Sequence, residues 1–327
     1  MIKRKVNIKW MDYSRGNPAR YEESFIYKYL IDRYVIEFTD KPDYLICSLT
    51  NHEDLDYDCV KIIHTIENVI PDFSRYDYVI GFDYLTLGDR YLRMPLFATY
   101  EAYGRLKDRL SNLPSDEELL GRKFCSFVVS NRGADPLRDK FFHELSKYKR
   151  VDSAGRHLNN VGAPCKDKLA FCSDYKFNIA IENSVSPGYT TEKIMEPLAV
   201  NSVPIYYGDP LVNNDFTPEC MVRISGPDDI ERAIEEVIAL DKDDVLYLKK
   251  VKSECLVKPW DWYKKQAERF LDNVFGQDLR NAKRTADFGH QMHIRRNLKQ
   301  MYFVEDILRR FVWPPVLLVK RLLGKAY

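Results

Sequence analysis

Short apolar runs alternate with amphipathic segments along most of the chain. In the first half, strands are predicted at residues 6–10, 34–38, 43–48, 60–65 and 78–82, with a helix at 21–31. In the second half, strands are predicted near 124–130, 177–182 and 203–207, and helices near 136–147, 190–199, 228–240 and 242–253. Such alternation predicts an α/β protein with parallel sheets covered by helices.

The length and composition favour two domains. A chain of 327 residues with 45% hydrophobic residues can fill two ordinary cores. The segment 111–122, with Pro114, Ser115 and Gly121, is predicted to link them. We therefore expect a first domain at 1–118 and a second at 119–277. Residues 278–327 are expected to form a separate tail.

The densest group of chemically active side chains lies at residues 177–193, FNIAIENSVSPGYTTEK. Residues 177–181 are typical of a short buried strand, the Ser-Pro-Gly sequence at 186–188 breaks it, and Thr190 or Thr191 can cap a following helix. The N-terminus of such a helix offers free N–H groups to an anion, and Lys193 adds a positive charge. The pattern predicts a phosphate-sugar site. For any one of these residues alone, a structural role is the alternative.

The same stretch carries a resemblance to a known family. IENSVSPGYTTEK at 181–193 resembles the signature of the α-1,3-fucosyltransferases of glycosyltransferase family 10, in their bacterial form. Three further blocks are similar and stand in the same order: YDYVIGFDYLTLGDRYLRMP at 76–95, FCSFVVSN at 124–131 followed by Leu137 and Arg138, and VPIYYGDP at 203–210. HTIENV at 64–69 falls where bacterial members keep a glutamate.

The resemblance implies a fold and a reaction. The fold would be of the GT-B type, with two Rossmann-like domains facing a cleft. The reaction would be an inverting transfer of fucose from GDP-β-L-fucose to the 3-OH of N-acetylglucosamine in a lactosamine-type glycan. The first domain would bind the acceptor, and the second would bind the donor. An aromatic helix at 259–275 would close the second domain and lean back onto the first.

The resemblance also implies roles for six residues. Glu67, in the acceptor domain, would be the catalytic base. Arg138 and Lys193 match the pyrophosphate-binding positions, and Glu192 would face the fucosyl ring and its developing positive charge. Asn183 and Tyr189 would hold phosphate, ribose or sugar hydroxyls.

This interpretation requires no metal or cofactor. The sequence Asp56-Tyr57-Asp58 has the form DxD, but it lies in an acidic loop away from the donor blocks, and a solvated turn is the preferred interpretation. Arg138 and Lys193 supply the charge, although loosely bound Mg²⁺ or Mn²⁺ could stimulate the reaction. His290 and His293 are interpreted as ordinary tail residues. No zinc-finger or phosphate-loop pattern occurs, and no nucleic-acid partner is expected.

Other functions stay open on the sequence. A membrane-associated protein that binds a nucleotide sugar without transferring it is one alternative. A transferase that uses another GDP-sugar, or one that makes an α-1,4 linkage, is a second.

The C-terminal tail is basic and amphipathic. Residues 1–277 hold 39 Lys and Arg against 45 Asp and Glu, whereas 278–327 hold 11 against 4. Apolar residues recur at helical spacing, namely Leu298, Met301, Val304, Leu308 and Phe311, with Arg295, Arg296, Lys299, Arg309 and Arg310 nearby. We expect residues 290–327 to bind an anionic inner-membrane surface. The alternative is a helix docked on its own protein or on the second subunit of a homodimer.

The cysteines indicate the compartment. Seven cysteines are scattered without a CxxC pair, which is typical of reduced thiols in a cytosolic protein. The first ten residues carry charges but no apolar segment of a secretion signal. A cytoplasmic protein, peripheral on the inner membrane, is therefore expected.

Overall fold

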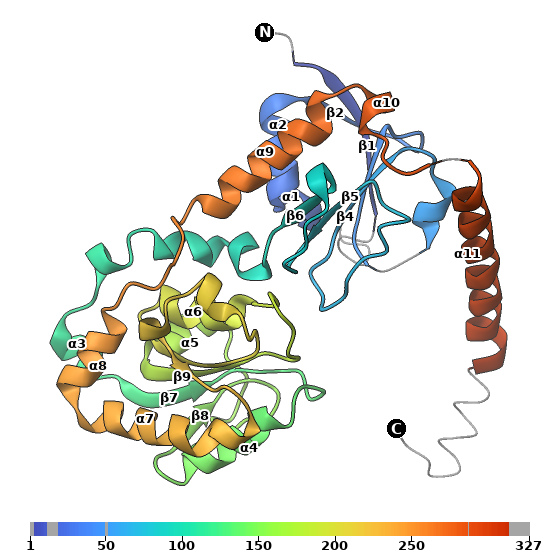
Figure 1. The fold of residues 1–327 in the computed structure, drawn as a ribbon. Coiled ribbons are helices and arrows are strands. Elements are labelled where there is room, and N and C mark those ends of the chain that lie inside the picture. The colour runs from blue at the N-terminus through green and yellow to red at the C-terminus, as the bar shows by residue number, and fades with distance from the viewer. Residues whose placement is uncertain (1–2, 12–18, 50–51, 287, 314–327) are drawn as a thin grey trace. The chain divides into compact units, whose positions relative to one another are not determined.

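The computed structural model describes residues 3–11, 19–49, 52–286 and 288–313 (Figure 1). The chain forms two compact units. The first comprises residues 1–80, 87–92 and 269–327, and the second comprises 81–86 and 93–268. These bounds differ from the predicted 118/119 and 277/278. Segment 93–118 packs in the second unit, and segment 269–277 packs in the first. The residues from 278 on, predicted as a separate tail, belong to the first unit.

The first unit is built on a sheet in the order β2-β1-β3-β4-β5-β6, and the pairs from β2 to β5 are parallel. Its strands are β1 (Lys5–Met11), β2 (Val35–Phe38), β3 (Tyr44–Cys47), β4 (Val60–His64), β5 (Tyr78–Gly81) and β6 (Tyr91–Arg93). Its helices are α1 (Ala19–Glu22), α2 (Phe25–Arg33), α10 (Leu279–Ala282) and α11 (His290–Ile307), with a π-helical turn at Leu308–Val312. Helix α9 (Trp262–Gly276) enters this unit with its second half.

Alternating side chains give this sheet two buried faces. Leu45 and Cys47 of β3 pack in one cluster with Ile63 of β4. Tyr44 points to the other face, where its ring lies 4.6 Å from that of Phe275 in α9. Tyr29 of α2 also contacts Phe275, and its hydroxyl donates to Asp272 at 2.5 Å. The C-terminal half of α9 therefore completes the core of the first unit.

The second unit is built on an all-parallel sheet in the order β11-β10-β9-β7-β8. Its strands are β7 (Lys123–Phe127), β8 (Val151–Ser153), β9 (Tyr175–Ile181), β10 (Val203–Tyr207) and β11 (Val222–Arg223). Its helices are α3 (Asp116–Leu120), α4 (Leu137–Ser146), α5 (Lys168–Ser173), α6 (Glu192–Ala199), α7 (Ile230–Lys242) and α8 (Asp244–Val251). Three 3₁₀ helices, at Leu96–Thr99, Glu101–Leu106 and Leu110–Asn112, precede α3.

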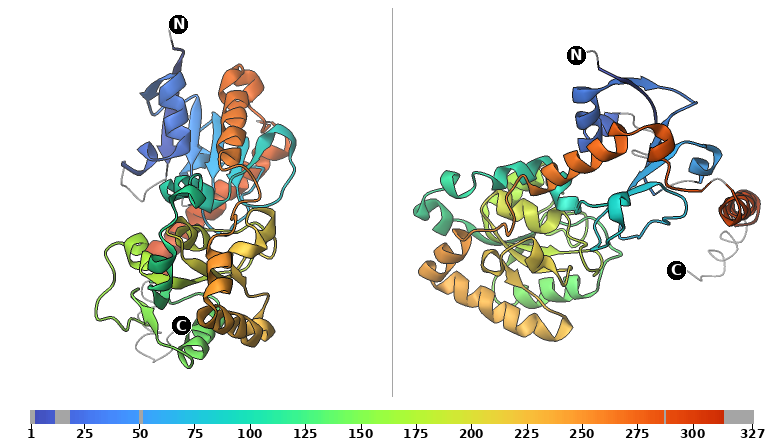
Figure 2. Two further views of the ribbon diagram at one scale, coloured as in Figure 1. Left: turned by 90° about the vertical axis from the view of Figure 1, so that its left-hand side faces the viewer. Right: turned by 45° about the horizontal axis from the view of Figure 1, so that its top comes forward.

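Helices cover both faces of this second sheet, as Figures 1 and 2 show. Phe177, Ile179 and Ile181 of β9 pack with apolar residues of α4, α7 and α8 in one core. Helices α5 and α6 contact β9 on the other face, where the Asn178 amide donates to Cys172 Sγ in α5. Both units are thus parallel α/β domains of the Rossmann type, as the GT-B expectation requires.

Two local predictions were wrong. The expected linker at 111–122 contains helix α3, whose N-cap Ser115 accepts a hydrogen bond from the backbone N–H of Glu118. The expected helix at 21–31 is interrupted, because Ser24 caps a new helix at Phe25 by accepting from the N–H of Tyr27. In both cases a serine caps a helix: Ser115 lies in the predicted linker, and Ser24 lies inside the predicted helix.

Candidate functional site

Two helices of the second unit begin at the carboxyl ends of neighbouring strands. Helix α4 follows β7, and α6 follows β9, which pairs with β7 in parallel. The connecting loops meet, since the N–H of Asp135 donates to the carbonyl of Asn183 at 3.2 Å. Helix N-termini at this edge of a parallel sheet offer unpaired N–H groups to an anion. Arg138 and Lys193 lie in the first turns of these helices.

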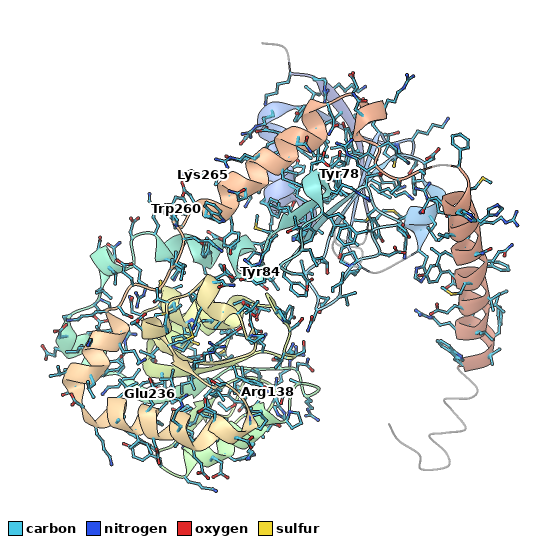
Figure 3. All side chains as sticks on the ribbon, in the orientation of Figure 1. Tyr78, Tyr84, Arg138, Glu236, Trp260 and Lys265 are labelled. Atoms are coloured by element: carbon cyan, nitrogen blue, oxygen red, sulfur yellow. The ribbon has the colours of Figure 1, made fainter. Side chains whose placement is uncertain are left out.

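Arg138 is almost fully buried at the start of α4 (Figure 3), with 1% of its surface exposed. Its Nη2 donates to the carbonyl of Asn131 at 2.7 Å, and its Nε lies 3.5 Å from the carboxylate of Asp139. Its Nη1 is buried and finds no hydrogen-bond acceptor among the described residues. An unsatisfied buried guanidinium donor is costly, and an anionic ligand would satisfy it.

Lys193 lies among acceptor groups at the N-terminus of α6. Its Nζ lies 3.2 Å from Glu182 and 3.4 Å from Glu192. Burial lowers the pKa of Lys193, but the two carboxylates outweigh it and hold the pKa above its ordinary value. The side chain is therefore a fixed positive charge, which suits an anion ligand.

Glu182 is the central buried acceptor of the loop. It is 1% exposed and receives the N–H of Thr191 at 2.8 Å and the Thr191 hydroxyl at 2.7 Å. Thr191 is the N-cap of α6, as predicted. Burial raises the pKa of Glu182, and Lys193 and these hydrogen bonds oppose the rise. Glu182 thus fixes both the start of α6 and the position of Lys193.

Glu192 stays charged despite its burial. Burial raises the pKa of its carboxyl, but Lys193 and Lys168 outweigh it and leave the pKa below its ordinary value. Burial, and then the carboxylate of Glu192, raise the pKa of Tyr100. A carboxylate held ionised in this way can stabilise positive charge on a ligand.

A second carboxylate, Asp209, shapes the loop between β9 and α6. It accepts the N–H of Gly188 at 2.8 Å and the hydroxyl of Thr190 at 2.9 Å. Gly188 has a positive φ of 85°, and a Cβ there would lie 2.5 Å from the carbonyl oxygen of Phe82. The ring of Phe82 in turn lies 5.1 Å from that of Tyr189. Only glycine fits at 188, and the hydrogen bonds of Asp209 to Gly188 and Thr190 hold the two neighbours of Tyr189 in the chain.

A buried ionic cluster anchors the segment that supports Tyr189. Arg93 donates to the carbonyl of Phe82 at 2.9 Å and to Asp215 at 2.7 and 3.2 Å. Asp215 also accepts from Lys258 at 2.9 Å and from the Tyr263 hydroxyl. The guanidinium of Arg93 lies 3.9 Å from the ring centre of Tyr84, which Figure 3 labels. Burial raises the pKa of Asp215, but these donors outweigh it and lower the pKa below its ordinary value.

Replacing Asp215 by Asn is expected to lower the free energy of unfolding by about 3–5 kcal/mol, because two cations would lose their buried counter-charge. Since its folded pKa is depressed, the stabilisation is present above about pH 4 and is lost as the pH falls further. Chemical denaturation at pH 7 measures the loss. As a control, Asp174→Asn, at an exposed ion pair with Lys123, should cost less than about 1 kcal/mol. Equal small losses in both variants would contradict the account.

The predicted site residues fall in two places. Arg138, Asn183, Tyr189, Glu192 and Lys193 all lie in the second unit, around the loops that follow β7 and β9. Glu67 belongs to the first unit. It is exposed on the loop after β4, at the carboxyl end of that strand, and its backbone carbonyl accepts from the hydroxyl of Thr65 at 3.1 Å.

Glu182, Asp209 and the Asp215 cluster were not among the predicted site residues. Glu182 and Asp209 lie directly in the quoted motifs, so their position was visible, but their partners were not. Each carboxylate is buried at the end of a central strand, where an acid needs donors. That signal, an acidic residue closing an apolar strand, could have identified both.

The acidic loop that contains Asp56-Tyr57-Asp58 is ion-paired. Asp54 pairs with Arg75, Asp56 lies 2.9 Å from Lys299, and Asp58 lies 3.0 Å from Lys283. The loop is therefore tied to other segments of the first unit rather than merely solvated. In the part of the chain that the structure describes, no group of three or more His, Cys, Asp or Glu residues could hold a metal ion.

Comparison with known proteins gives matches over most of the chain. The family model "Alpha-(1,3)-fucosyltransferase FucT N-terminal domain" matches residues 8–100, and "Glycosyltransferase family 10 (fucosyltransferase) C-term" matches residues 121–269. An α-(1,3)-fucosyltransferase FucT of Helicobacter pylori is 35% identical over 219 residues, which are 58% of this chain and 45% of that protein. The human GDP-fucose protein O-fucosyltransferase 3 is 31% identical over 51% of this chain and 38% of that protein. The chain thus matches less than half the length of these relatives.

Solved structures agree with the sequence matches. A crystal structure of an α1,3-fucosyltransferase has a TM-score of 0.73 and 26% identity, and the match covers 84% of this chain and 91% of that one. A structure of α1,3-fucosyltransferase with GDP-fucose has a TM-score of 0.69, with the same identity and coverage. In these comparisons both parallel α/β units of the chain have counterparts.

Proposed function

Because the chain belongs to glycosyltransferase family 10, the fucosyltransferases, we propose that it transfers L-fucose from GDP-β-L-fucose to a glycan. The acceptor would be the 3-OH of N-acetylglucosamine in a lactosamine-type glycan, such as a lipopolysaccharide O-antigen. The products would be an α-1,3-fucoside and GDP. One observation carries the proposal: two helix N-termini, with Arg138 and Lys193 in their first turns, lie at neighbouring strand ends and suit a diphosphate.

The donor half of the mechanism follows from these charges. As the bond between the anomeric carbon and the β-phosphate oxygen breaks, negative charge grows on the diphosphate. The unsatisfied Nη1 of Arg138 and the ammonium of Lys193 would offset that charge where it develops. A loosely bound Mg²⁺ or Mn²⁺ would also offset the negative charge of the diphosphate.

The fucosyl ring gains positive charge in the same step. The carboxylate of Glu192, which Lys193 and Lys168 keep ionised, would stabilise it. Asn183 and Tyr189 lie on the same loop and would hold sugar or ribose hydroxyls. Asp209 and Glu182 would act only through the loop, by holding Tyr189 and Lys193 in place.

The acceptor half rests on Glu67. The acceptor hydroxyl must lose a proton as its oxygen attacks the anomeric carbon, from the side opposite the leaving group. Glu67 is an exposed carboxylate at the carboxyl end of a parallel strand, which is where ligands of such sheets bind. It would accept the proton in a single inverting displacement.

The test is the structure of the product. Wild-type protein is incubated with GDP-fucose and either N-acetyllactosamine or its β-1,3-linked isomer, and the product is characterised by NMR. We expect α-linked fucose on the 3-OH of N-acetylglucosamine in the first acceptor. Fucose on the 4-OH of the second would favour the α-1,4 alternative, and equal use of GDP-mannose would refute the donor assignment. Donor binding without transfer to any acceptor would favour the binding-protein alternative.

Helix α11 supports the proposed membrane attachment. Several polar side chains join it to the rest of the first unit: Tyr302 hydrogen-bonds with Arg75, Lys299 pairs with Asp56, and Gln291 donates to Ser74. Figures 1 and 2 show it beside the loop that carries the 3₁₀ helix Glu53–Asp56. Phe303 and Phe311 are 67% and 73% exposed. The helix thus docks through a mostly polar side and leaves most of its apolar side chains open.

This orientation is the one that a membrane-binding helix needs. Leu298, which the sequence assigned to the apolar stripe, is only partly exposed, whereas Met301, Val304, Leu308 and Phe311 are exposed. No helix among the described residues is long and apolar enough to cross a bilayer. Residues 314–327 of the predicted attachment segment lie outside the described part. We propose that α11 holds the protein on the cytoplasmic face of an anionic membrane.

Replacing Phe303 and Phe311 together by Ser is expected to reduce co-sedimentation with phosphatidylglycerol vesicles at least about tenfold, because the buried apolar area is lost. The exposed Val245 of α8 provides the control, since Val245→Ser should bind vesicles as the wild type does. Unchanged vesicle binding in the double variant would refute the membrane role. Loss of a dimer in sedimentation velocity, without any effect on vesicle binding, would instead assign this side of the helix to a second copy.

A further inference from the structure

A hollow of about 320 Å³ opens at the carboxyl ends of β1 and β2 in the first unit. Its lining includes three aromatic rings, those of Trp10, Tyr21 and Phe38, and the ion-paired side chains of Lys9 and Asp40. The reaction described above uses none of these residues.

The three rings form one continuous aromatic surface. Trp10 and Tyr21 are stacked, with centroids 5.5 Å apart and planes 16° from parallel. Tyr21 also contacts Phe38, again with centroids 5.5 Å apart. Phe38 ends the edge strand β2 and keeps half of its surface exposed. Large rings that stay open beside a hollow offer flat apolar faces to a ligand.

Polar groups stand at the side of this aromatic surface. Lys9 Nζ lies 2.5 Å from the carboxylate of Asp40 and 5.0 Å from the ring centre of Tyr57. The side chain of Lys9 is 26% exposed and that of Asp40 is 93% exposed. The Lys9 ammonium is thus a hydrogen-bond donor held in place, and the Asp40 carboxylate is a hydrogen-bond acceptor open to solvent. Aromatic faces bordered by a few charged groups suit a sugar ring, which has an apolar C–H face and a rim of hydroxyls.

The position of the hollow relates it to Glu67. Strands β1, β3 and β4 are consecutive and parallel in the sheet, so the carboxyl ends of all three lie along one edge. Glu67 follows β4, and the hollow lies at β1 and β2, about 10 Å further along that edge at the usual strand spacing. The strand order reverses between β1 and β3, and the crevice where ligands of open parallel sheets bind therefore lies between the hollow and Glu67 along this edge.

We propose that this hollow binds a sugar unit of the acceptor glycan beyond the one that receives fucose. The inference rests on the proposed function, since it assumes that the acceptor hydroxyl is held at Glu67. A glycan anchored there would extend along the strand ends and place a further ring on Trp10, Tyr21 and Phe38. Lys9 and Asp40 would hydrogen-bond its hydroxyls. The preferred acceptor is then an oligosaccharide longer than a disaccharide.

A second hollow of the first unit provides the comparison. It has a volume of about 260 Å³ and lies at the amino ends of β3 and β4, where Pro42, Asp58, Leu279 and Arg280 contribute to its lining. None of the described residues that line it is aromatic. Because it is at the opposite edge of the sheet from Glu67, an acceptor glycan should not reach it.

The experiment compares two acceptors in full-length variants. N-acetyllactosamine is the short acceptor, and a linear trimer of the same disaccharide unit is the long one. Phe38→Ala and Trp10→Ala should each raise the KM for the long acceptor about tenfold, which corresponds to losing one aromatic contact of roughly 1.4 kcal/mol. Their kcat, and their KM for the short acceptor, should not change. Leu279→Ala and Arg280→Ala serve as matched controls and should leave both acceptors unaffected.

Binding without catalysis separates this inference from the proposed function. Saturation-transfer NMR of the long acceptor with full-length protein reports which sugar units contact it, with no donor present. Signals on the non-reacting units that disappear in Phe38→Ala, a substitution of a half-exposed side chain, support the hollow even if no fucose is transferred. The inference would be overturned if Phe38→Ala had the wild-type KM for each acceptor, or if its NMR signals were unchanged. Neither result would affect the proposed fucosyl transfer.

Discussion

Glu67→Gln is expected to lower the rate of fucose transfer to N-acetyllactosamine by about 10²–10⁴-fold. The amide has nearly the shape of the carboxylate but cannot accept a proton from the attacking hydroxyl. Affinity for GDP-fucose should not change, because the proposed donor residues all lie in the second unit. Initial rates at saturating donor and acceptor, together with calorimetric titration of GDP-fucose, measure the two effects separately.

An exposed glutamate of the same unit provides the control for Glu67. Glu37 pairs with Lys5 on the edge of the first sheet, so Glu37→Gln should transfer fucose at the wild-type rate. The substitution Glu67→Gln alters an exposed loop side chain, and the unfolding temperature should not move. A wild-type transfer rate in Glu67→Gln would remove Glu67 as the base.

Lys193→Met should lower kcat by about 10²–10³-fold, because a fixed charge would be missing where the diphosphate gains its charge. The acceptor KM should stay constant. The single variant also leaves Glu182 buried without its cation, which costs stability. The double variant Lys193→Met with Glu182→Gln removes that unpaired carboxylate. It should recover stability but not activity.

Lys147 is the matched control for Lys193. It forms an exposed pair with Glu144 at the end of α4, and Lys147→Met should behave like the wild type in both rate and stability. If the double variant regained activity together with stability, Lys193 would be a structural residue. The charge at the leaving group would then have to come from Arg138.

The longer elements could be predicted from local pattern alone. Strands β1, β2, β3, β4, β5, β7, β9 and β10 and helices α4, α6, α7 and α8 lie within a few residues of their predicted bounds, because apolar periodicity is a local property. The strands β6, β8 and β11 were missed. They hold only two or three residues each, too few for a period to appear.

Where each segment packs could not be predicted locally. The second half of α9 packs in the first unit, although the predicted second domain extends to residue 277 and only the expected leaning of this helix onto the first domain pointed that way. Phe275 is buried there against Tyr44, some 230 positions earlier in the chain. An amphipathic pattern shows that a helix has an apolar side, but it does not show which sheet that side will meet.

In the candidate site, too, local features were predicted and long-range contacts were not. Lys193 and Thr191 were placed correctly at the start of α6, because capping depends on neighbouring residues. The supports of that loop were missed, since Asp209 reaches Gly188 across 21 positions and Arg93 reaches Asp215 across 122. Charged residues in contact at such separations leave no pattern in a single sequence.

The most direct test of the account is a single transfer assay with labelled GDP-fucose and N-acetyllactosamine. Wild type, Glu67→Gln and Lys193→Met are compared, and both released GDP and fucosylated product are quantified. The account predicts α-fucosylated product and one GDP per product in the wild type. It predicts almost no product in either variant, with donor affinity retained in Glu67→Gln. Release of GDP without glycan product in the wild type, or wild-type product yields in both variants, would contradict it.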